Sequence, residues 1–256
     1  MPGQKARSKT YLEAYRVKFK PPLQRATFLR RYKRFLADVE FADGGQQTIH
    51  CPNTGSMRNC LVPGSPCWIS KSDNPKRKYA YTWEIATVPG GCKAGINTSR
   101  ANSLVVEAIQ SGTVQELQGY PSLQTEVGYG REKSRIDIYL ADHPRRQQKN
   151  CYVEVKNVTL AEADKRGLFP DAVSTRGSKH LRELMAVKAE GHRAVLFFCV
   201  QHNGIDWVEA AADIDPEYTA TLSQAVKQGV EVLAYRAELS AREIVLRERI
   251  PFKAPK

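Results

Sequence analysis

The sequence lacks any apolar run approaching 18 residues, the length that a membrane-spanning helix requires. Its first 20 residues are positively charged, but no apolar stretch follows them, so they do not form a secretory signal. It also contains no G-x-x-x-x-G-K-[ST] phosphate loop, no G-x-S-x-G elbow and no H-E-x-x-H motif. These absences argue against membrane proteins, exported proteins and three common enzyme classes, and we expect a cytoplasmic protein with no membrane partner.

Cysteine pairs at close spacing are missing as well. None of the six cysteines forms a C-x-x-C motif, and with no export signal we expect free thiols in a reducing compartment. A zinc site built from Cys51, Cys60 and Cys67 is an open alternative, although structural zinc sites usually show closer pairs.

Positive charge is abundant, and its position is informative. The 256 residues carry a net charge of +12, with 41% hydrophobic and 26% charged residues, an ordinary globular composition. Residues 1–100 hold 18 Lys and Arg against 6 Asp and Glu, whereas residues 101–256 hold 21 of each. A basic module joined to a neutral one predicts that the first contacts a polyanion. The alternative is a surface charge that only aids solubility.

The first part of the chain consists of short strand-like runs separated by turns such as Asp43-Gly44-Gly45 and Pro89-Gly90-Gly91. Five or six strands in about 75 residues predict a small barrel of the OB type, a fold that binds nucleic acid on one curved face. The predicted strands span residues 23–29, 32–41, 47–51, 66–70, 79–88 and 93–96.

The pattern changes near Ser99 to an α/β layered arrangement. The chain is therefore predicted to form two domains, an OB-like barrel over residues 1–98 and an α/β domain over residues 99–256. Ser99 and Asp215 are the expected N-caps of the first and third helices. The predicted helices span 100–110, 175–189 and 216–228, and the strands span 123–129, 135–140, 151–159, 194–200 and 230–235.

The strongest chemical signal is Asp137, followed seventeen residues later by Glu154 and Lys156. Side chains two residues apart on a strand share a face, so Glu154 and Lys156 project together, about 7 Å apart. If the preceding strand pairs with this one, Asp137 lies beside them. Two close carboxylates repel unless a divalent cation joins them, and oxygen ligands favour Mg²⁺ or Mn²⁺. The alternative is an exposed strand face with an ordinary Glu–Lys pair.

Further residues are predicted to support this site. Glu107, on the helix before the first strand of the second domain, is a candidate for another metal-proximal carboxylate. Arg176, Lys179 and His180, on the helix over 175–189, are candidates for binding a phosphate. For each of them a solvated helix face is the alternative. An N-terminal helix cap is the alternative role for Asp171.

The barrel carries its own basic cluster, in which cations alternate with aromatic residues. If the cluster forms a strand, Tyr32 shares a face with two cations, and cations bind phosphates while an aromatic face stacks on a base. Residues 76–78 form a second basic cluster. The polar residues 50–57 predict a tightly hydrogen-bonded loop. The predicted nucleic-acid contacts of the first cluster are Arg30, Arg31, Tyr32, Lys33 and Arg34.

An ordered set of motifs resembles the sugar fermentation stimulation protein A family. These motifs are LRRYKRFLADV, HCPNTGSM, INTSRAN, SRIDIYL, CYVEVKNVTL, FPDAVSTRGSKHL and IDPEY, spread from about residue 22 to residue 235. The resemblance implies an N-terminal OB-like domain, a C-terminal domain like the PD-(D/E)xK nucleases, DNA binding and a link to sugar (maltose) utilisation genes. By that fold's motif, Asp137, Glu154 and Lys156 stand at catalytic-type positions.

Three functions compete at this stage. The first is a DNA-binding regulator whose nuclease-like site only binds, and this is the function we expect. The second is a nuclease that uses Mg²⁺ or Mn²⁺ to cleave DNA or RNA, and the third is an interaction module that does not bind nucleic acid. The choice between single- and double-stranded DNA and the formation of homo-oligomers are left open.

Overall fold

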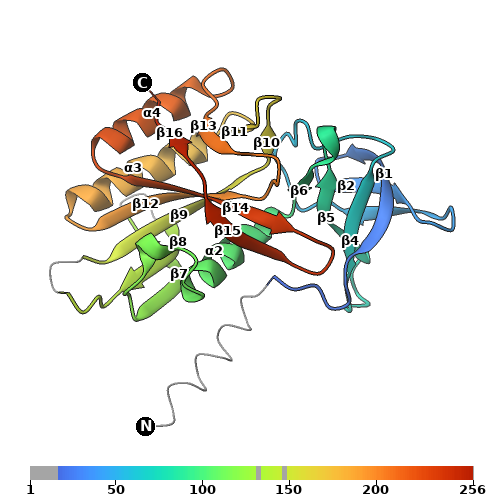
Figure 1. Cartoon of the computed structure of the whole chain (residues 1–256), viewed down its shortest axis with the longest axis horizontal. Coiled ribbons are helices and arrows are strands. Elements are labelled where there is room, and N and C mark those ends of the chain that lie inside the picture. The colour runs from blue at the N-terminus through green and yellow to red at the C-terminus, as the bar shows by residue number, and fades with distance from the viewer. Residues whose placement is uncertain (1–16, 131–133, 146–148, 256) are drawn as a thin grey trace, which may run out of the picture.

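The computed structural model describes residues 17–130, 134–145 and 149–255. At the start of this part of the chain, five short strands form a closed barrel and a sixth, β6, pairs with its edge (Figure 1). The strand order is β3-β2-β1-β4-β5-β6, and a pairing between β3 and β5 closes the barrel. Phe28 and Trp83 stack at its centre with ring centroids 4.6 Å apart. The strands are β1 (Gln24–Tyr32), β2 (Leu36–Glu40), β3 (Gln46–His50), β4 (Pro66–Lys71), β5 (Tyr81–Thr87) and β6 (Lys93–Gly95).

The basic cluster lies on a hairpin and does not form one strand. Tyr32 ends β1 and pairs with Leu36 at the start of β2, so the predicted strand over 32–41 begins too early. Lys33 and Arg34 take positive φ angles of 48° and 61°, which turn the chain between the two strands. Arg30 and Tyr32 do share a face of β1, with Arg30 lying over the Tyr32 ring at 5.4 Å, but the predicted continuation of one strand through Arg34 is wrong.

The second unit is built on a six-stranded sheet in the order β15-β14-β12-β9-β8-β7. Its β12 pairs in parallel with both β9 and β14, and the run RAVLFFCV is buried on both faces, as its continuous apolar pattern predicts. The strands are β7 (Ser122–Tyr129), β8 (Ser134–Ala141), β9 (Cys151–Val158), β12 (Arg193–Val200), β14 (Glu231–Leu239) and β15 (Ile244–Arg249).

Helices of the described chain cover both faces of this sheet (Figure 1). The apolar side chains of α2 (Ala101–Gln110) pack on one face, and those of α3 (Thr175–Ala189) and α4 (Pro216–Lys227) pack on the other. Asp215 caps α4 as predicted, accepting a hydrogen bond from the amide of Tyr218. Ser99 does not cap α2, because the side chain of Asn97 instead caps a 3₁₀ turn that leads into the helix. In the described part of the chain no helix is long and apolar enough to cross a membrane.

A second, four-stranded sheet was not predicted from the sequence. It has the order β10-β11-β13-β16 and lies next to α4 and the end of β14. Its strands are two to four residues long, too short to show an alternating pattern. They are β10 (Leu160–Ala161), β11 (Arg166–Phe169), β13 (Trp207–Ala210) and β16 (Phe252–Lys253).

Residues 17–23, which the sequence assigned to the first domain, pack on the second. The amide of Phe19 donates to the carbonyl of Arg242, and that of Leu23 donates to Ala241, at 2.8 and 2.7 Å. Val17 and Phe19 lie in the apolar core that α2 shares with the large sheet. The rest of that N-terminal stretch, residues 1–16, lies outside the described residues. The two units are therefore joined by more than the chain connection near Ser99.

A close backbone approach between the units gives a test of this junction. The amide of Gly95 donates to the carbonyl of buried Gln201, and a Cβ at Gly95 would lie 2.6 Å from the Gln201 side chain. We expect Gly95→Ala to lower the free energy of unfolding by about 1–3 kcal/mol, because packed interiors tolerate added volume poorly. Gly128→Ala is the control, since nothing lies within 4 Å of the new methyl group. Urea unfolding measures both variants, and an unchanged Gly95→Ala midpoint would contradict the tight junction.

Candidate functional site

Adjacent antiparallel strands β8 and β9 bring the predicted acidic residues and lysine together. Ile138 pairs with Val153, and the Oδ2 atom of Asp137 accepts a hydrogen bond of 2.7 Å from the amide of Val155. Asp137 therefore reaches the point of β9 that lies between Glu154 and Lys156. The side chains of Val153 and Val155 enter the core beneath α2. This alternation leaves Glu154, only 2% exposed, on the other face of the strand.

Glu154 is held through one of its two oxygens. Its Oε1 accepts a hydrogen bond of 2.8 Å from Lys156 Nζ and contacts Nδ1 of His180. Because Nε2 of His180 accepts a bond from Arg176, the ring proton belongs on Nδ1 and is donated to Glu154. The Oε2 atom of Glu154 is buried and has no hydrogen-bond partner among the described residues. A ligand at this oxygen would satisfy it.

The two carboxylates differ in their titration. Burial, followed by the negative charge of Glu154, raises the pKa of Asp137. Burial also acts to raise the pKa of Glu154, but the charge of Lys156 and the bond from His180 outweigh it and leave that pKa lowered. Glu154 is therefore compensated within the protein, whereas the bonds from Val155 and Asn102 and the charge of Lys156 only partly offset the burial of Asp137. A cation beside the pair would relieve the second charge.

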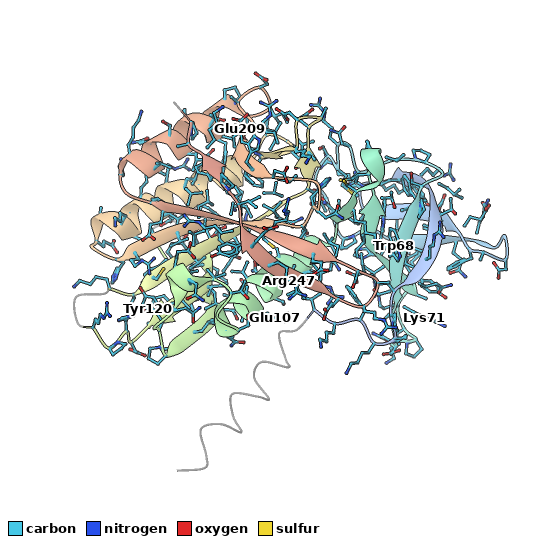
Figure 2. All side chains as sticks on the ribbon, in the orientation of Figure 1. Trp68, Lys71, Glu107, Tyr120, Glu209 and Arg247 are labelled. Carbon is cyan, nitrogen blue, oxygen red and sulfur yellow. The ribbon has the colours of Figure 1, made fainter. Side chains whose placement is uncertain are left out.

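Helix α2 reaches this site through Asn102 and not through Glu107. Asn102 Nδ2 donates to Asp137 at 2.9 Å and to Glu126 at 3.4 Å. Glu107, labelled in Figure 2, comes five residues later, about 140° around the helix. Its Oε2 accepts a bond from the amide of Val17. Across the described residues, no group of three or more His, Cys, Asp and Glu side chains is arranged to hold a metal ion. The predicted set of Asp137, Glu154 and Glu107 is therefore not assembled.

Glu126 is a carboxylate of this site that the sequence did not reveal. The register between β7 and β8 puts it opposite Asp137, and its φ of 56° interrupts the regular pairing there. It is exposed and contacts Asn102, which joins it to Asp137. Its position depends on a backbone irregularity within β7 that the residue pattern does not predict, because the rest of β7 has the pattern of an ordinary strand.

Unpaired polar atoms surround Glu154 on the side that faces α3 and α4. The hydroxyl groups of Tyr129 and Tyr218 are buried and have no partner in the part of the chain that is described. Burial, and then the nearby charge of Glu154, raises the pKa of both tyrosines. Glu183, also buried, lies next to Gly130 at the same edge. Buried polar groups are rarely left unsatisfied, so this region is suited to ordered water or an ion.

The cationic residues of α3 do not form the predicted phosphate-binding turn, because two of them contact the acidic site. His180 is buried against Glu154, and Arg176 donates to it from the preceding turn at 3.3 Å. His180 therefore contacts Glu154 directly, and Arg176 contacts Glu154 only through His180. Lys179 is half-buried on the same helix. Asp171 is not a helix cap, because Ser174 caps α3.

On the barrel, most of the predicted nucleic-acid contacts already have partners. Arg30 forms an ion pair of 2.8 Å with Asp38, and the Tyr32 hydroxyl donates to the same carboxylate. Arg31 donates to the carbonyls of two residues in the loop over 50–57. Lys33 and Arg34 are exposed at the hairpin turn. The structure therefore gives Arg30, Arg31 and Tyr32 partners within the barrel.

The loop over 50–57 is tightly hydrogen-bonded, as predicted, and it also joins the two units. Its Ser56 hydroxyl and Met57 amide both donate to Asp171 Oδ2 at 3.1 Å. A Cβ at Gly55 would lie 2.8 Å from that same oxygen, so only glycine fits this contact without a shift. The loop thus lies directly against the second unit.

Among the hollows along the boundary between the barrel and the α/β unit, three adjoin the loop over 50–57. The basic hollow, about 640 Å³, is lined by Lys18, Lys20, His50, Lys71, Arg77 and Arg100. The lysine hollow, about 260 Å³, is lined by Asn53, Thr54, Asn102, Lys156, Asn157 and Phe169. The hairpin hollow, about 560 Å³, is lined by Arg31, Arg34, Thr54, Gly55, Phe169 and Val173.

The basic hollow gathers cations that lie far apart in the sequence, which is why their clustering could not be predicted. They come from the segment before β1, from β4 and its following loop, and from the start of α2; Lys71 is labelled at the edge of the barrel in Figure 2. Burial and the charge of Arg77 lower the pKa of His50. Arg100 is paired with buried Glu84 at 2.9 Å, whereas Lys71 and Arg77 have no acidic partner among the ion pairs of the described residues.

The cysteines do not form the alternative zinc site. Cys51 and Cys60 are buried and bonded separately, the first to Met57 and the second to the carbonyl of Thr159. Burial raises the pKa of Cys60 and of Cys67 to about 12, so both remain thiols at neutral pH. Metal ions bind thiolates, and the described residues hold no cluster that fits one.

An OB barrel followed by an α/β domain, with an acidic strand pair and a lysine at the boundary, defines a two-domain class of protein. Residues 29–96 match the profile described as "SfsA N-terminal OB domain", and residues 99–243 match "Sugar fermentation stimulation protein RE domain". The chain belongs to the sugar fermentation stimulation protein family. The name of this family links it with sugar fermentation.

Individual relatives support this family membership over nearly the full chain. The "Sugar fermentation stimulation protein homolog" of Saccharophagus degradans is 58% identical and covers 91% of this chain and 99% of its own length. The homolog of Teredinibacter turnerae is 60% identical, with 91% and 98% covered. A solved structure of Pyrococcus furiosus SfsA in complex with Ca²⁺ has the same fold, with a TM-score of 0.81, 24% identity, and 93% and 99% of the two chains covered.

Proposed function

We propose that this chain binds DNA, and that it acts as a regulator linked to sugar (maltose) utilisation. The observation that carries DNA binding is the basic hollow, in which five Lys and Arg side chains from separate segments line one concavity. The first 100 residues also hold the entire excess positive charge of the chain. Cations clustered in a cleft raise the local concentration of a polyanion and bind its phosphates without reading sequence. The link to sugar rests on the family name.

A second candidate function is cleavage of DNA or RNA with Mg²⁺ or Mn²⁺. It is favoured by the buried Glu154 oxygen that has no partner among the described residues and by the raised pKa of Asp137. These two carboxylates supply oxygen ligands of the kind that a hard divalent cation prefers, and Mg²⁺ is commonly held by one or two carboxylates with water completing its shell. Glu126, exposed beside Asn102, is close enough to assist them. The Pyrococcus furiosus protein was solved in complex with Ca²⁺, and this supports a cation at this fold.

The protein's own groups would divide the work of cleavage. Asp137 and Glu154 would hold the ion, which when bound supplies charge stabilisation and a more acidic water. Lys156, held at 2.8 Å by Glu154, lines the lysine hollow and would neutralise charge developing on a phosphate there. His180 and Arg176 would fix the orientation of Glu154, as outer groups do in metal sites.

The experiment that tests both candidates uses labelled single- and double-stranded DNA with the full chain. DNA binding predicts a rise in fluorescence anisotropy in EDTA, where no cleavage can occur. Nuclease activity predicts shortened products that require Mg²⁺ or Mn²⁺ and disappear with EDTA. Binding without products would support the regulator and exclude cleavage of these substrates. Absence of binding to either DNA at low salt would contradict the proposed function.

Glu126→Gln provides a milder probe of the cation site. Removing one charge near Asp137 is expected to weaken Mn²⁺ binding about tenfold, the lower end of effects seen for groups that support metal ligands. Stability is expected to change little, because Glu126 is exposed. Calorimetric titration with Mn²⁺ measures the affinity, and Glu217→Gln, an exposed carboxylate on α4, is the matched control. Equal affinities for the two variants would remove Glu126 from the site.

A further inference from the structure

We propose that one strand of DNA runs along the boundary between the two units, past Lys156, and that residues 52–56 form the wall that holds it there. The ligand is thus single-stranded DNA, bound in preference to a duplex. The inference rests on the proposed DNA binding and adds strandedness and path.

The three hollows follow one another along this boundary. The lysine and hairpin hollows share Thr54, Gly55, Phe169 and Asp171, so each opens against the same short loop. The basic hollow reaches Pro52, which immediately precedes residues that line the lysine hollow. Lys156 therefore lies in the middle of a row of hollows, with basic residues at both ends.

Hydrogen bonds between the units fix the width of this path. Asn59 of the barrel donates to the carbonyl of Ala161 in the α/β unit at 2.9 Å. Within the barrel, Thr98 donates to the carbonyl of Pro52 at 3.1 Å and holds the start of the loop. Asp171 adds the two bonds from the loop over 50–57 described above. Hollows of 260 and 560 Å³ between walls tied in this way suit a single strand. A duplex is far wider, since its major groove alone measures about 12 Å.

The chemistry of the walls suits exposed bases as well as phosphates. Phe169 lines both the lysine and hairpin hollows with a half-buried ring whose edge also contacts Tyr218. Val173, 73% exposed, stands at the rim of the hairpin hollow. Phe35, 48% exposed, adjoins Arg34 at the tip of the hairpin. Exposed aromatic groups stack on bases, while nearby cations bind the backbone. Only an unpaired strand offers its base faces to such groups.

Thr54→Trp tests the path by filling it. Thr54 is exposed, lines two hollows and carries no charge, so the indole narrows the path and leaves the cations intact. Ala220→Trp, on the exposed face of α4, is the matched control. Val173→Asp is a second variant at an exposed position that places negative charge on the rim. Anisotropy titrations compare single-stranded and duplex DNA of equal length at one salt concentration.

The wild type is expected to bind the single strand at least tenfold more tightly than the duplex. Thr54→Trp is expected to lose at least tenfold in single-strand affinity, Val173→Asp about fivefold, and Ala220→Trp less than twofold. Equal or tighter duplex binding by the wild type, or single-strand affinities that survive both path variants, would overturn the inference while leaving DNA binding intact. Absence of binding to both DNAs would instead defeat the proposed function itself.

Discussion

Asp137→Asn is expected to abolish Mn²⁺ binding and, at the same time, to stabilise the folded protein by about 1 kcal/mol, a typical gain when a strained site is neutralised. Because the pKa of Asp137 is raised by burial and by Glu154, the folded state takes up a proton more readily than the unfolded chain. Wild-type stability therefore falls as pH rises through the titration of Asp137, from its unfolded pKa toward the raised folded one. The variant has no ionisable group at this position, so its stability does not fall with pH for this reason. Its amide oxygen keeps the bond from Val155, and the Asn102 side chain can turn to accept from the new NH₂ group.

Glu154→Gln is expected to abolish Mn²⁺ binding too, but to destabilise the fold by about 3 kcal/mol, as when one partner of a buried ion pair is removed. The pKa of Glu154 is lowered, so its charge stabilises the fold above the unfolded pKa and this contribution is lost as pH falls through the folded one. The variant leaves Lys156, 13% exposed, without its counter-ion.

Calorimetry with Mn²⁺ and urea unfolding at several pH values measure both variants. Asp213→Asn, at an exposed position, is the control and is expected to match the wild type in both respects. Opposite stability changes with a shared loss of Mn²⁺ binding are the expected pattern. Retained Mn²⁺ binding by either variant, or a loss of stability in Asp137→Asn, would contradict the proposed cation site.

Reversing two cations of the basic hollow is expected to have the largest effect on DNA affinity. The double variant Lys71→Glu and Arg77→Glu should weaken binding on the order of 10- to 100-fold for every DNA sequence tested, because both side chains would contact phosphates. Neither has an acidic partner among the described residues, so the fold should tolerate the change. The slope of log affinity against log salt should fall by about 1.4 to 1.8, the counter-ions that two phosphates release.

A control with the same change in net charge combines Arg25→Glu with Lys227→Glu. Arg25 is exposed on β1 and Lys227 lies in the last turn of α4, and neither lines the basic hollow. Anisotropy titrations over a range of salt concentrations compare the two double variants. If both weaken binding equally, net charge and not the hollow accounts for affinity.

Local patterns predicted the acidic site and most of the regular elements well. The alternation in CYVEVKNV places Val153 and Val155 in the core and leaves Glu154 on the other face, which the structure confirms. The helix over 175–189 and the buried strand near 194–200 also follow from continuous local patterns, with Gly191 just beyond the helix.

Features that depend on backbone geometry or distant contacts were missed. The hairpin turn at Lys33 and Arg34 needs positive φ angles that neither residue type favours. Glu126 and Asn102 reach Asp137 from two other elements, and no spacing in the sequence links them. The sequence pattern identified the helix that carries Glu107, but it did not show which face of that helix points toward Asp137. Glu107 was therefore wrongly assigned to the site.

Iron-directed cleavage of bound single-stranded DNA tests most directly the central claim that DNA lies beside the carboxylates of the α/β domain. Fe²⁺ would occupy the proposed cation site, and ascorbate with peroxide would generate radicals that cut only nearby nucleotides. Wild-type protein is expected to give iron-dependent cuts in an end-labelled strand. Asp137→Asn should bind the strand equally well by anisotropy and give none. Absence of cuts with saturating wild type, or equal cutting by the variant, would contradict the account.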